Sequence, residues 1–212
     1  MRKRIRYIHI FIIKGIHRLY AAIVYRCRNW YYIDYLQLFN AVLKDKKSIR
    51  FIGPCVLQIK KGAKIFIGKG FRVHSGKRIG SDTFPSSKIT VMEGATLIIG
   101  DNSGMSNTVL WCREKIEIGD YVNIGTGCFI MDNNFHSTDW HIRMSDEENG
   151  YITTAPVVIK SHAFIGAHCI INKGVTIGEK SIVAAGSVVV KNIPDEELWG
   201  GNPAKFIKRM EG

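Results

Sequence analysis

An aliphatic residue that recurs every six positions restricts the fold of this chain more than any other feature of its sequence. From Ile159 onward, six positions spaced six residues apart all carry β-branched aliphatic side chains. They are Ile159, Ile165, Ile171, Ile177, Val183 and Val189. Four residues after each lies a mostly small side chain, in the order Ala163, Cys169, Val175, Ser181, Ser187 and Ile193. The register recurs upstream at Ile118, Ile124 and Ile130, and weaker copies occur within 65–68 and 97–100.

A period of six excludes the common elements. An amphipathic α-helix repeats its apolar face every 3.6 residues, and turns at this interval come too quickly for hairpins of ordinary strands. The period fits a solenoid with three short strands per coil, so roughly 18 residues per coil. The aliphatic residue then points inward and the small residue occupies a corner. The sequence therefore predicts a mainly β fold, a parallel β-helix preceded by an N-terminal helical segment.

The positive charge is concentrated at the N-terminus. The chain has 212 residues and a net charge of +12. Residues 1–50 contain 12 Lys and Arg against Asp34 and Asp45, whereas residues 51–212 contain 18 basic and 16 acidic residues. Because the main domain is nearly neutral, we expect no nucleic-acid partner.

The first residues are apolar and basic together. The run Ile8–Ile13 is six residues long, whereas a membrane span needs ~20 and a signal sequence needs roughly 7–15. Apolar residues at helical spacing predict a basic amphipathic helical segment over 1–48. They are Ile5, Ile8, Ile12, Ile16, Leu19 and Ile23. Two interpretations remain: this helix packs on the main domain or another subunit, or residues 1–30 contact an anionic membrane.

The cysteines, which are Cys27, Cys55, Cys112, Cys128 and Cys169, are odd in number and form no CxxC pair. This pattern argues against a disulfide framework or a zinc site and favours a reducing cytoplasm. Cys128 and Cys169 occupy corner slots of the repeat. We therefore interpret them as small buried residues rather than nucleophiles.

The repeat is interrupted over about 133–156. Ile130 and Ile159 lie 29 residues apart, which we interpret as one coil of 18 residues and 11 extra residues. The interruption is polar, so it should project as a loop, and projecting loops often carry function. His136 at its entrance is a candidate general base, with Asp132 or Asp139 on its other ring nitrogen. A plain surface histidine is the alternative, and it is our interpretation of His141.

His136 and His141 also have the five-residue spacing seen in the γ-class carbonic anhydrases, which hold zinc on a similar solenoid. The third histidine of that site has no counterpart in 99–103. Two ligands do not close a zinc site, so we expect no metal.

Residues 106–210 resemble the hexapeptide-repeat O-acetyltransferases of the galactoside and maltose acetyltransferase type, especially those that modify bacterial surface polysaccharides. The resemblance is carried by GMSNT (104–108), EIGDYVNIG (117–125), MDNNFHSTD (131–139), the repeats of 156–194 and GGNPAKFIKRM (200–210). It implies a left-handed parallel β-helix, a homotrimer and acetyl-CoA as the acyl donor.

The resemblance also implies site residues. His136 matches the catalytic base of that family, and Asn107 matches an asparagine that contacts the acceptor and the acetyl group. The positions that match the CoA groove are Phe164, Gly166, Ala167, Ala184, Ala185, Lys191, Lys205 and Lys208. Phe164 and Ala167 depart from the Trp and Ser that are frequent there. Residues 1–50 do not match the acceptor-contacting helices of the small sugar acetyltransferases, so the acceptor stays open.

We thus expect a helical segment at 1–48, a β-helix at 49–194 and a C-terminal tail at 195–212 that ends in a helix. The expected function is CoA-dependent O-acetylation of a sugar hydroxyl in surface polysaccharide synthesis, in the cytoplasm or at the inner face of the membrane. The alternatives are an N-acyltransferase acting on an amino sugar or nucleotide sugar, and a non-catalytic solenoid scaffold.

Overall fold

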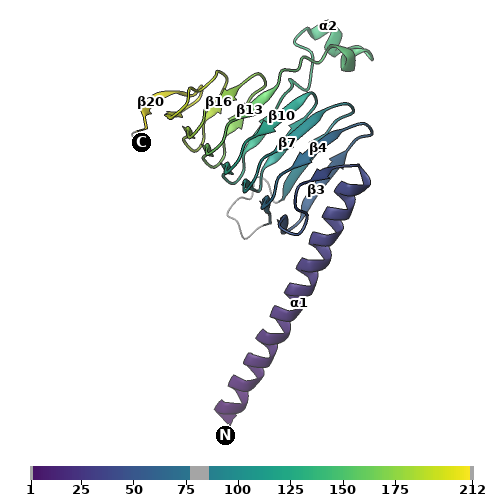
Figure 1. Ribbon diagram of the computed structural model, residues 1–212, viewed down its shortest axis with the longest axis vertical. Helices are drawn as coiled ribbons and strands as arrows, with labels where there is room; N and C mark the ends of the chain where they lie inside the picture. Colours follow the sequence, from purple (N-terminus) through teal and green to yellow (C-terminus); the bar gives the residue numbers. More distant parts are fainter. Residues whose placement is uncertain (1, 77–85, 211–212) are drawn as a thin grey trace.

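Three parallel sheets wind around one apolar column, and a long helix extends from one end of it (Figure 1). The computed structural model describes residues 2–76 and 86–210, and for residues 2–18 and 21 it describes the backbone alone. Sheet A contains β1 (Val42–Leu43), β4 (Lys64–Ile67), β7 (Thr96–Ile99), β10 (Lys115–Ile118), β13 (Val157–Ile159) and β16 (Thr176–Ile177). Sheet B contains β2 (Arg50–Ile52), β5 (Arg72–His74), β8 (Gly104–Ser106), β11 (Asn123–Ile124), β14 (Phe164–Ile165), β17 (Ile182–Val183), β19 (Glu197–Gly200) and β20 (Lys205–Arg209). Sheet C contains β3 (Cys55–Ile59), β6 (Ser87–Val91), β9 (Val109–Cys112), β12 (Phe129–Met131), β15 (Ile170–Ile171) and β18 (Val188–Val189).

The strand register confirms the predicted coil. Ile159 pairs with Ile177, Phe164 with Ile182, and Ile170 with Val188, so each pair of aligned residues is 18 apart. The aliphatic residues of the repeat all point inward and are buried. Burying each such side chain stabilises the fold by roughly 1.5–3 kcal/mol before conformational entropy is counted. The fold is the parallel β-helix that the period of six predicts, in the left-handed class that the family resemblance implies.

The corner positions are as tightly enclosed as the strands. Cys128 and Cys169 have no exposed surface, and their thiols donate to the carbonyl oxygens of Gly166 and Ala184. Their interpretation as small buried residues is confirmed. Burial also raises the pKa of the Cys55 thiol to about 12, which suppresses its thiolate at neutral pH.

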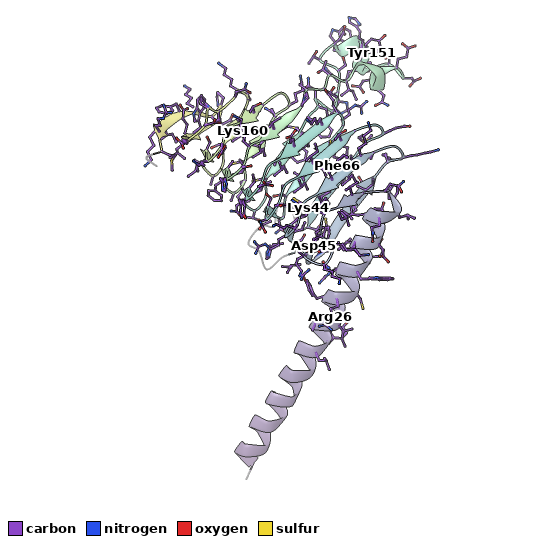
Figure 2. The ribbon with its side chains drawn as sticks, in the orientation of Figure 1. Arg26, Lys44, Asp45, Phe66, Tyr151 and Lys160 are labelled. Carbon is purple, nitrogen blue, oxygen red and sulfur yellow. The ribbon has the colours of Figure 1, made fainter. Side chains whose placement is uncertain are left out.

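The length that we assigned to the interruption is wrong. Ile118 of β10 pairs with Ile159 of β13 in the adjacent coil, 41 residues later rather than 18. Ile130 ends one coil on sheet C and Ile159 begins the next coil on sheet A. The repeat would separate two such consecutive strands by six residues, so no further coil lies between them. The loop contains α2 (Trp140–Arg143) and a 3-10 helix (Glu148–Tyr151), and Tyr151 stands away from the coils (Figure 2).

Helix α1 (Arg2–Leu38) covers the first coil with its last turns. Tyr32 and Leu36 are buried there, and the Tyr32 hydroxyl accepts a hydrogen bond from the Cys55 N–H at 2.7 Å. The Asn29 side chain binds the backbone N–H of Phe51 and the carbonyl of Ile49. These contacts satisfy backbone groups that an uncovered end of the solenoid would leave to water.

The rest of α1 extends past the coils (Figure 1). The predicted division of side chains over 5–16 lies outside the described side chains. Leu19 and Ile23, which belong to the predicted apolar face, are 65% and 53% exposed. Within the described residues, no helix is long and apolar enough to span a membrane.

Both predicted ends of the solenoid differ from the structure. The helix ends at Leu38, and β1 already pairs with β4 inside the segment that we expected to be helical to residue 48. The helix that we expected at the end of the C-terminal tail is wrong, because β19 adds to β17 in parallel and β20 folds back antiparallel on β19. The open edge of sheet B offers unpaired backbone groups, and a strand satisfies them where a helix does not.

Candidate active site

His136 lies just after β12, where the chain leaves the coil for the loop. Its Nδ1 atom is 3.1 Å from Oε1 of Glu148, which also accepts the backbone N–H of Ser137. The histidine side chain is 68% exposed and that of Glu148 20% exposed. Because a carboxylate only accepts, the contact places the proton on Nδ1 and leaves the Nε2 lone pair available. Within the described part of the chain, Nε2 has no hydrogen-bond partner.

The carboxylates that we predicted for this role are wrong. Asp132 is fully buried and accepts the backbone N–H groups of Arg113 and Glu114 at 2.7–2.9 Å. Asp139 caps α2 by accepting the backbone N–H of His141 at 2.8 Å. Asp132 also accepts from the Asn133 side chain, so both carboxylates are engaged elsewhere, and the ring of His136 pairs with Glu148 instead.

Arg113 anchors the segment that presents Glu148. Its guanidinium donates to the backbone oxygen and to the side-chain oxygen of Asn149, both at 2.8 Å. Since Asp132 binds the backbone of Arg113, the start of the loop and the 3-10 helix that carries Glu148 are tied to the same residue, which follows β9 of sheet C. Sequence reasoning missed Glu148 because it lies 12 residues from His136 in a loop that contains several carboxylates.

Asn107 occupies the corner between sheets B and C and is fully buried with a positive φ of 41°. Its side-chain oxygen accepts the Gly76 N–H at 2.8 Å, and its amide donates to the Gly76 carbonyl at 3.2 Å. One amide N–H and one lone pair remain. Asn107 precedes β9, His136 follows β12, and β9 pairs with β12. A single chain therefore places these two residues at opposite ends of the strands of sheet C.

The predicted groove positions separate into three places. Gly166, Ala167, Ala184 and Ala185 stack at the corner that follows sheet B, where a Cβ on Gly166 would lie 2.5 Å from the Ala185 nitrogen. We call the surface of these four closely stacked residues the alanine ledge. Phe164 projects from the outer face of sheet B beside the ledge.

The three predicted lysines are exposed, as phosphate-binding side chains must be. Lys205 and Lys208 lie on β20, and Lys191 follows β18 at the other end of sheet C, on the same corner as His136. His141 stacks its ring on Trp140, with the centroids 3.6 Å apart. Among the side chains that the structure describes, no group of three His, Cys, Asp or Glu could hold a metal ion.

The fold and the repeat define a hexapeptide-repeat protein. Residues 156–191 match the family described as hexapeptide repeat of succinyl-transferase. A Staphylococcus aureus (strain Mu50) protein named "Putative acetyltransferase" is 37% identical over 112 residues, which are 46% of this chain and 56% of the relative. The galactoside O-acetyltransferase of Escherichia coli K12 is 28% identical over 147 residues, which are 69% of this chain and 58% of the relative.

A solved structure supports the same class. The hexapeptide-repeat-containing acetyltransferase from Vibrio cholerae is 26% identical and aligns with a TM-score of 0.51, covering 84% of this chain and 77% of its own. The resemblance to hexapeptide-repeat acetyltransferases is therefore confirmed. The chain spans only a little more than half the length of the two curated relatives described here.

Proposed function

We propose that this protein is a CoA-dependent O-acetyltransferase that transfers acetyl from acetyl-CoA to a sugar hydroxyl of a surface polysaccharide or its precursor. One observation supports the proposal above all. His136 is held by Glu148 through Nδ1, with Nε2 directed to no described partner. This is the arrangement of a general base. The relatives named as acetyltransferases support acetyl transfer as the reaction.

The proposed reaction needs no covalent enzyme intermediate. Nε2 of His136 takes the proton of the acceptor hydroxyl as its oxygen attacks the thioester carbonyl. The tetrahedral intermediate then collapses, the C–S bond breaks, and the leaving thiolate receives the proton from the imidazolium. Glu148 stabilises the imidazolium while it carries the proton. The products are the acetyl ester and free CoA.

The alanine ledge fits the donor. Small side chains and closely stacked backbone allow an extended pantetheine arm to approach, and Phe164 adds an apolar wall in place of the more frequent Trp. Ala167 lacks the hydroxyl of the more frequent Ser, which removes one hydrogen bond worth about 1 kcal/mol. Exposed Lys205 and Lys208 supply charge for phosphate groups.

We propose a homotrimer for the following reason. One chain keeps Asn107 and the alanine ledge at one corner and His136 at another. A closed ring of identical chains brings the His136 corner of one copy to the ledge corner of the next. The three-sided solenoid offers flat faces for such contacts.

Mixing two inactive variants tests this assembly. His136→Ala removes the base, and Ala185→Trp blocks the exposed ledge. Chains mixed before assembly should regain up to about one quarter of wild-type activity, because random pairing places an intact base against an intact ledge in that fraction of interfaces. No recovery in mixed oligomers would place base and ledge in one chain.

The central test is acetyl transfer itself. Purified wild-type protein should release CoA thiol from acetyl-CoA in the presence of a hydroxyl-bearing sugar, and His136→Ala should abolish this release while the thermal unfolding midpoint stays unchanged. His141→Ala is the matched control and should stay active. Supplying amino sugars beside neutral sugars distinguishes an N-acyltransferase. Retained transfer in the folded His136→Ala variant would reject the base.

We also propose that residues 1–30 contact an anionic membrane surface. Residues 1–33 contain eight Lys and Arg and no Asp or Glu. Where the structure describes the side chains of this segment, exposed apolar and aromatic residues include Leu19, Tyr20 and Trp30. A basic residue near an anionic surface contributes about 1 kcal/mol, and exposed aromatic side chains suit the interface.

Vesicle co-sedimentation tests the contact. The wild-type protein should bind vesicles that contain phosphatidylserine and should be released by high salt, because the attraction is screened. A variant with Arg2, Lys3, Arg4 and Arg6 changed to Gln should bind less. Equal binding of both proteins, or equal binding to neutral vesicles, would reject the proposal.

A further inference from the structure

The outer face of sheet C carries a hollow of ≈ 350 Å³ beside the start of the loop. Its walls include Val56, Lys88, Val109, Trp111, Phe129 and Phe135. Strands β3, β6, β9 and β12 lie side by side in register, and their alternate residues Ile89, Leu110 and Ile130 point into the core. The residues between them must therefore face outward. The volume falls in the range of small-molecule sites.

Phe135 connects this hollow to the proposed base. Its N–H donates to the Asn133 side chain at 2.9 Å, and its φ is +61°, so the backbone turns sharply here. The ring lies 5.0 Å from that of Trp111, edge to face, and 5.9 Å from that of Phe129. The next residue is His136. One wall of the hollow is thus a chain neighbour of the imidazole, within a Cα step of about 3.8 Å.

Among the described residues that line the hollow, Lys88 is the one that carries a charge. Its Nζ lies 4.7 Å from the centroid of the Trp111 ring, a favourable cation–π distance. Among the described residues, no carboxylate pairs with Lys88. A ligand for this hollow should therefore combine an apolar face with a negative charge.

The order of the coils indicates which substrate the hollow suits. The alanine ledge and Phe164, proposed for the donor, belong to coils that follow the loop, whereas the hollow belongs to coils that precede it. His136 lies between these two levels of the stack. In the proposed ring, with its axis along the solenoid, the ledge of the neighbouring copy lies at the same level as that of its own chain. A base must stand between the acceptor hydroxyl and the acyl group, so the hollow is placed for the acceptor.

We propose that this hollow binds an acidic sugar acceptor, a pyranose ring that carries a carboxylate. The apolar face of the ring packs against Trp111 and Phe135, and Lys88 binds the carboxylate in a charge-assisted hydrogen bond. The inference rests on the proposed function, because it identifies the acceptor of the same site. It assigns Lys88 and Trp111 to acceptor specificity.

Two acceptors with the same ring test the proposal, methyl β-glucuronide and methyl β-glucoside. Lys88→Gln should raise the KM for the glucuronide about tenfold, the size of one charge-assisted hydrogen bond, while the KM values for acetyl-CoA and the glucoside stay unchanged. Lys88→Arg should restore most of the loss. Trp111→Leu should weaken both sugars. Lys64, exposed on the outer face of sheet A, provides the control variant Lys64→Gln, which should match the wild type.

Direct titration without acetyl-CoA separates this inference from the activity. Wild-type protein should bind the glucuronide, and Lys88→Gln should lose that binding even if no acyl transfer is ever observed. Loss of transfer with binding retained would count against the proposed reaction alone. The proposal is overturned if Lys88→Gln affects both sugars alike, if it changes the KM for acetyl-CoA instead, or if Trp111→Leu dissociates the oligomer, which would make the hollow a subunit interface.

Discussion

Glu148 is the residue that the structure adds to the site, and replacing it with Gln removes its charge while keeping an acceptor oxygen. Two unit charges at the observed 3.1 Å attract by about 1 kcal/mol in water and about 5 kcal/mol at an effective dielectric constant of 20. The histidine is mostly exposed, so solvent screening favours the lower end. We therefore expect Glu148→Gln to reduce the stabilisation of the His136 imidazolium by about 1–2 kcal/mol. This loss predicts a fall in kcat of about 5- to 30-fold.

The assay is the initial rate of CoA thiol release at saturating acetyl-CoA and acceptor. Glu147→Gln is the matched control, because Glu147 is exposed and its side chain makes no capping hydrogen bond. Raising the ionic strength should narrow the difference between wild type and Glu148→Gln, since the contact is partly screened. Thermal unfolding of all variants checks that the loop change has not disturbed the fold.

Two results would refute this reasoning. If Glu148→Gln and Glu147→Gln lose the same small activity, the carboxylate does not stabilise the charged imidazole. If the difference in rate between the wild type and Glu148→Gln does not narrow as the ionic strength rises, Glu148 acts through something other than its charge on His136.

Three further predictions concern the scaffold. Asp132→Ala leaves two backbone N–H groups without their acceptor in a buried site and should lower the free energy of unfolding by about 2–4 kcal/mol in urea titration, whereas exposed Asp146→Ala should change it little. Gly166→Ala places a Cβ 2.5 Å from a backbone atom of the next coil and should lower the free energy of unfolding by about 1–3 kcal/mol. Gly150→Ala, where nothing lies within 4 Å, should leave it unchanged. Equal stability of the two variants would contradict the close stacking of the coils at Gly166. In native protein an alkylating reagent should modify Cys27 and spare the four buried cysteines, as read by mass spectrometry before and after unfolding.

The β-helix was predictable because its information is local and repeated. Each aliphatic residue at the six-residue period is buried for the same reason as its neighbours, so the pattern specifies the inward face, the coil length and the corners without knowledge of any long-range contact. His136 was also identifiable, because it stands where that period stops. Its motif resembles the acetyltransferases, and a polar interruption of an apolar column must project outward.

The six-residue period did not constrain the contacts of the projecting loop, and only the tertiary structure decided them. Several carboxylates in the loop were equivalent candidates in sequence. Glu148 reaches the imidazole because Arg113 binds Asp132 at the start of the loop and Asn149 in the 3-10 helix. The predicted length of the interruption was wrong because the sheet at which the chain rejoins the solenoid depends on how the loop closes. Phe135 likewise meets Trp111 through a backbone turn that no repeat encodes. A hydrophobic period determines which side chains point inward, whereas the contacts of an outward loop depend on polar hydrogen bonds between residues distant in sequence, which form only once the coils are stacked.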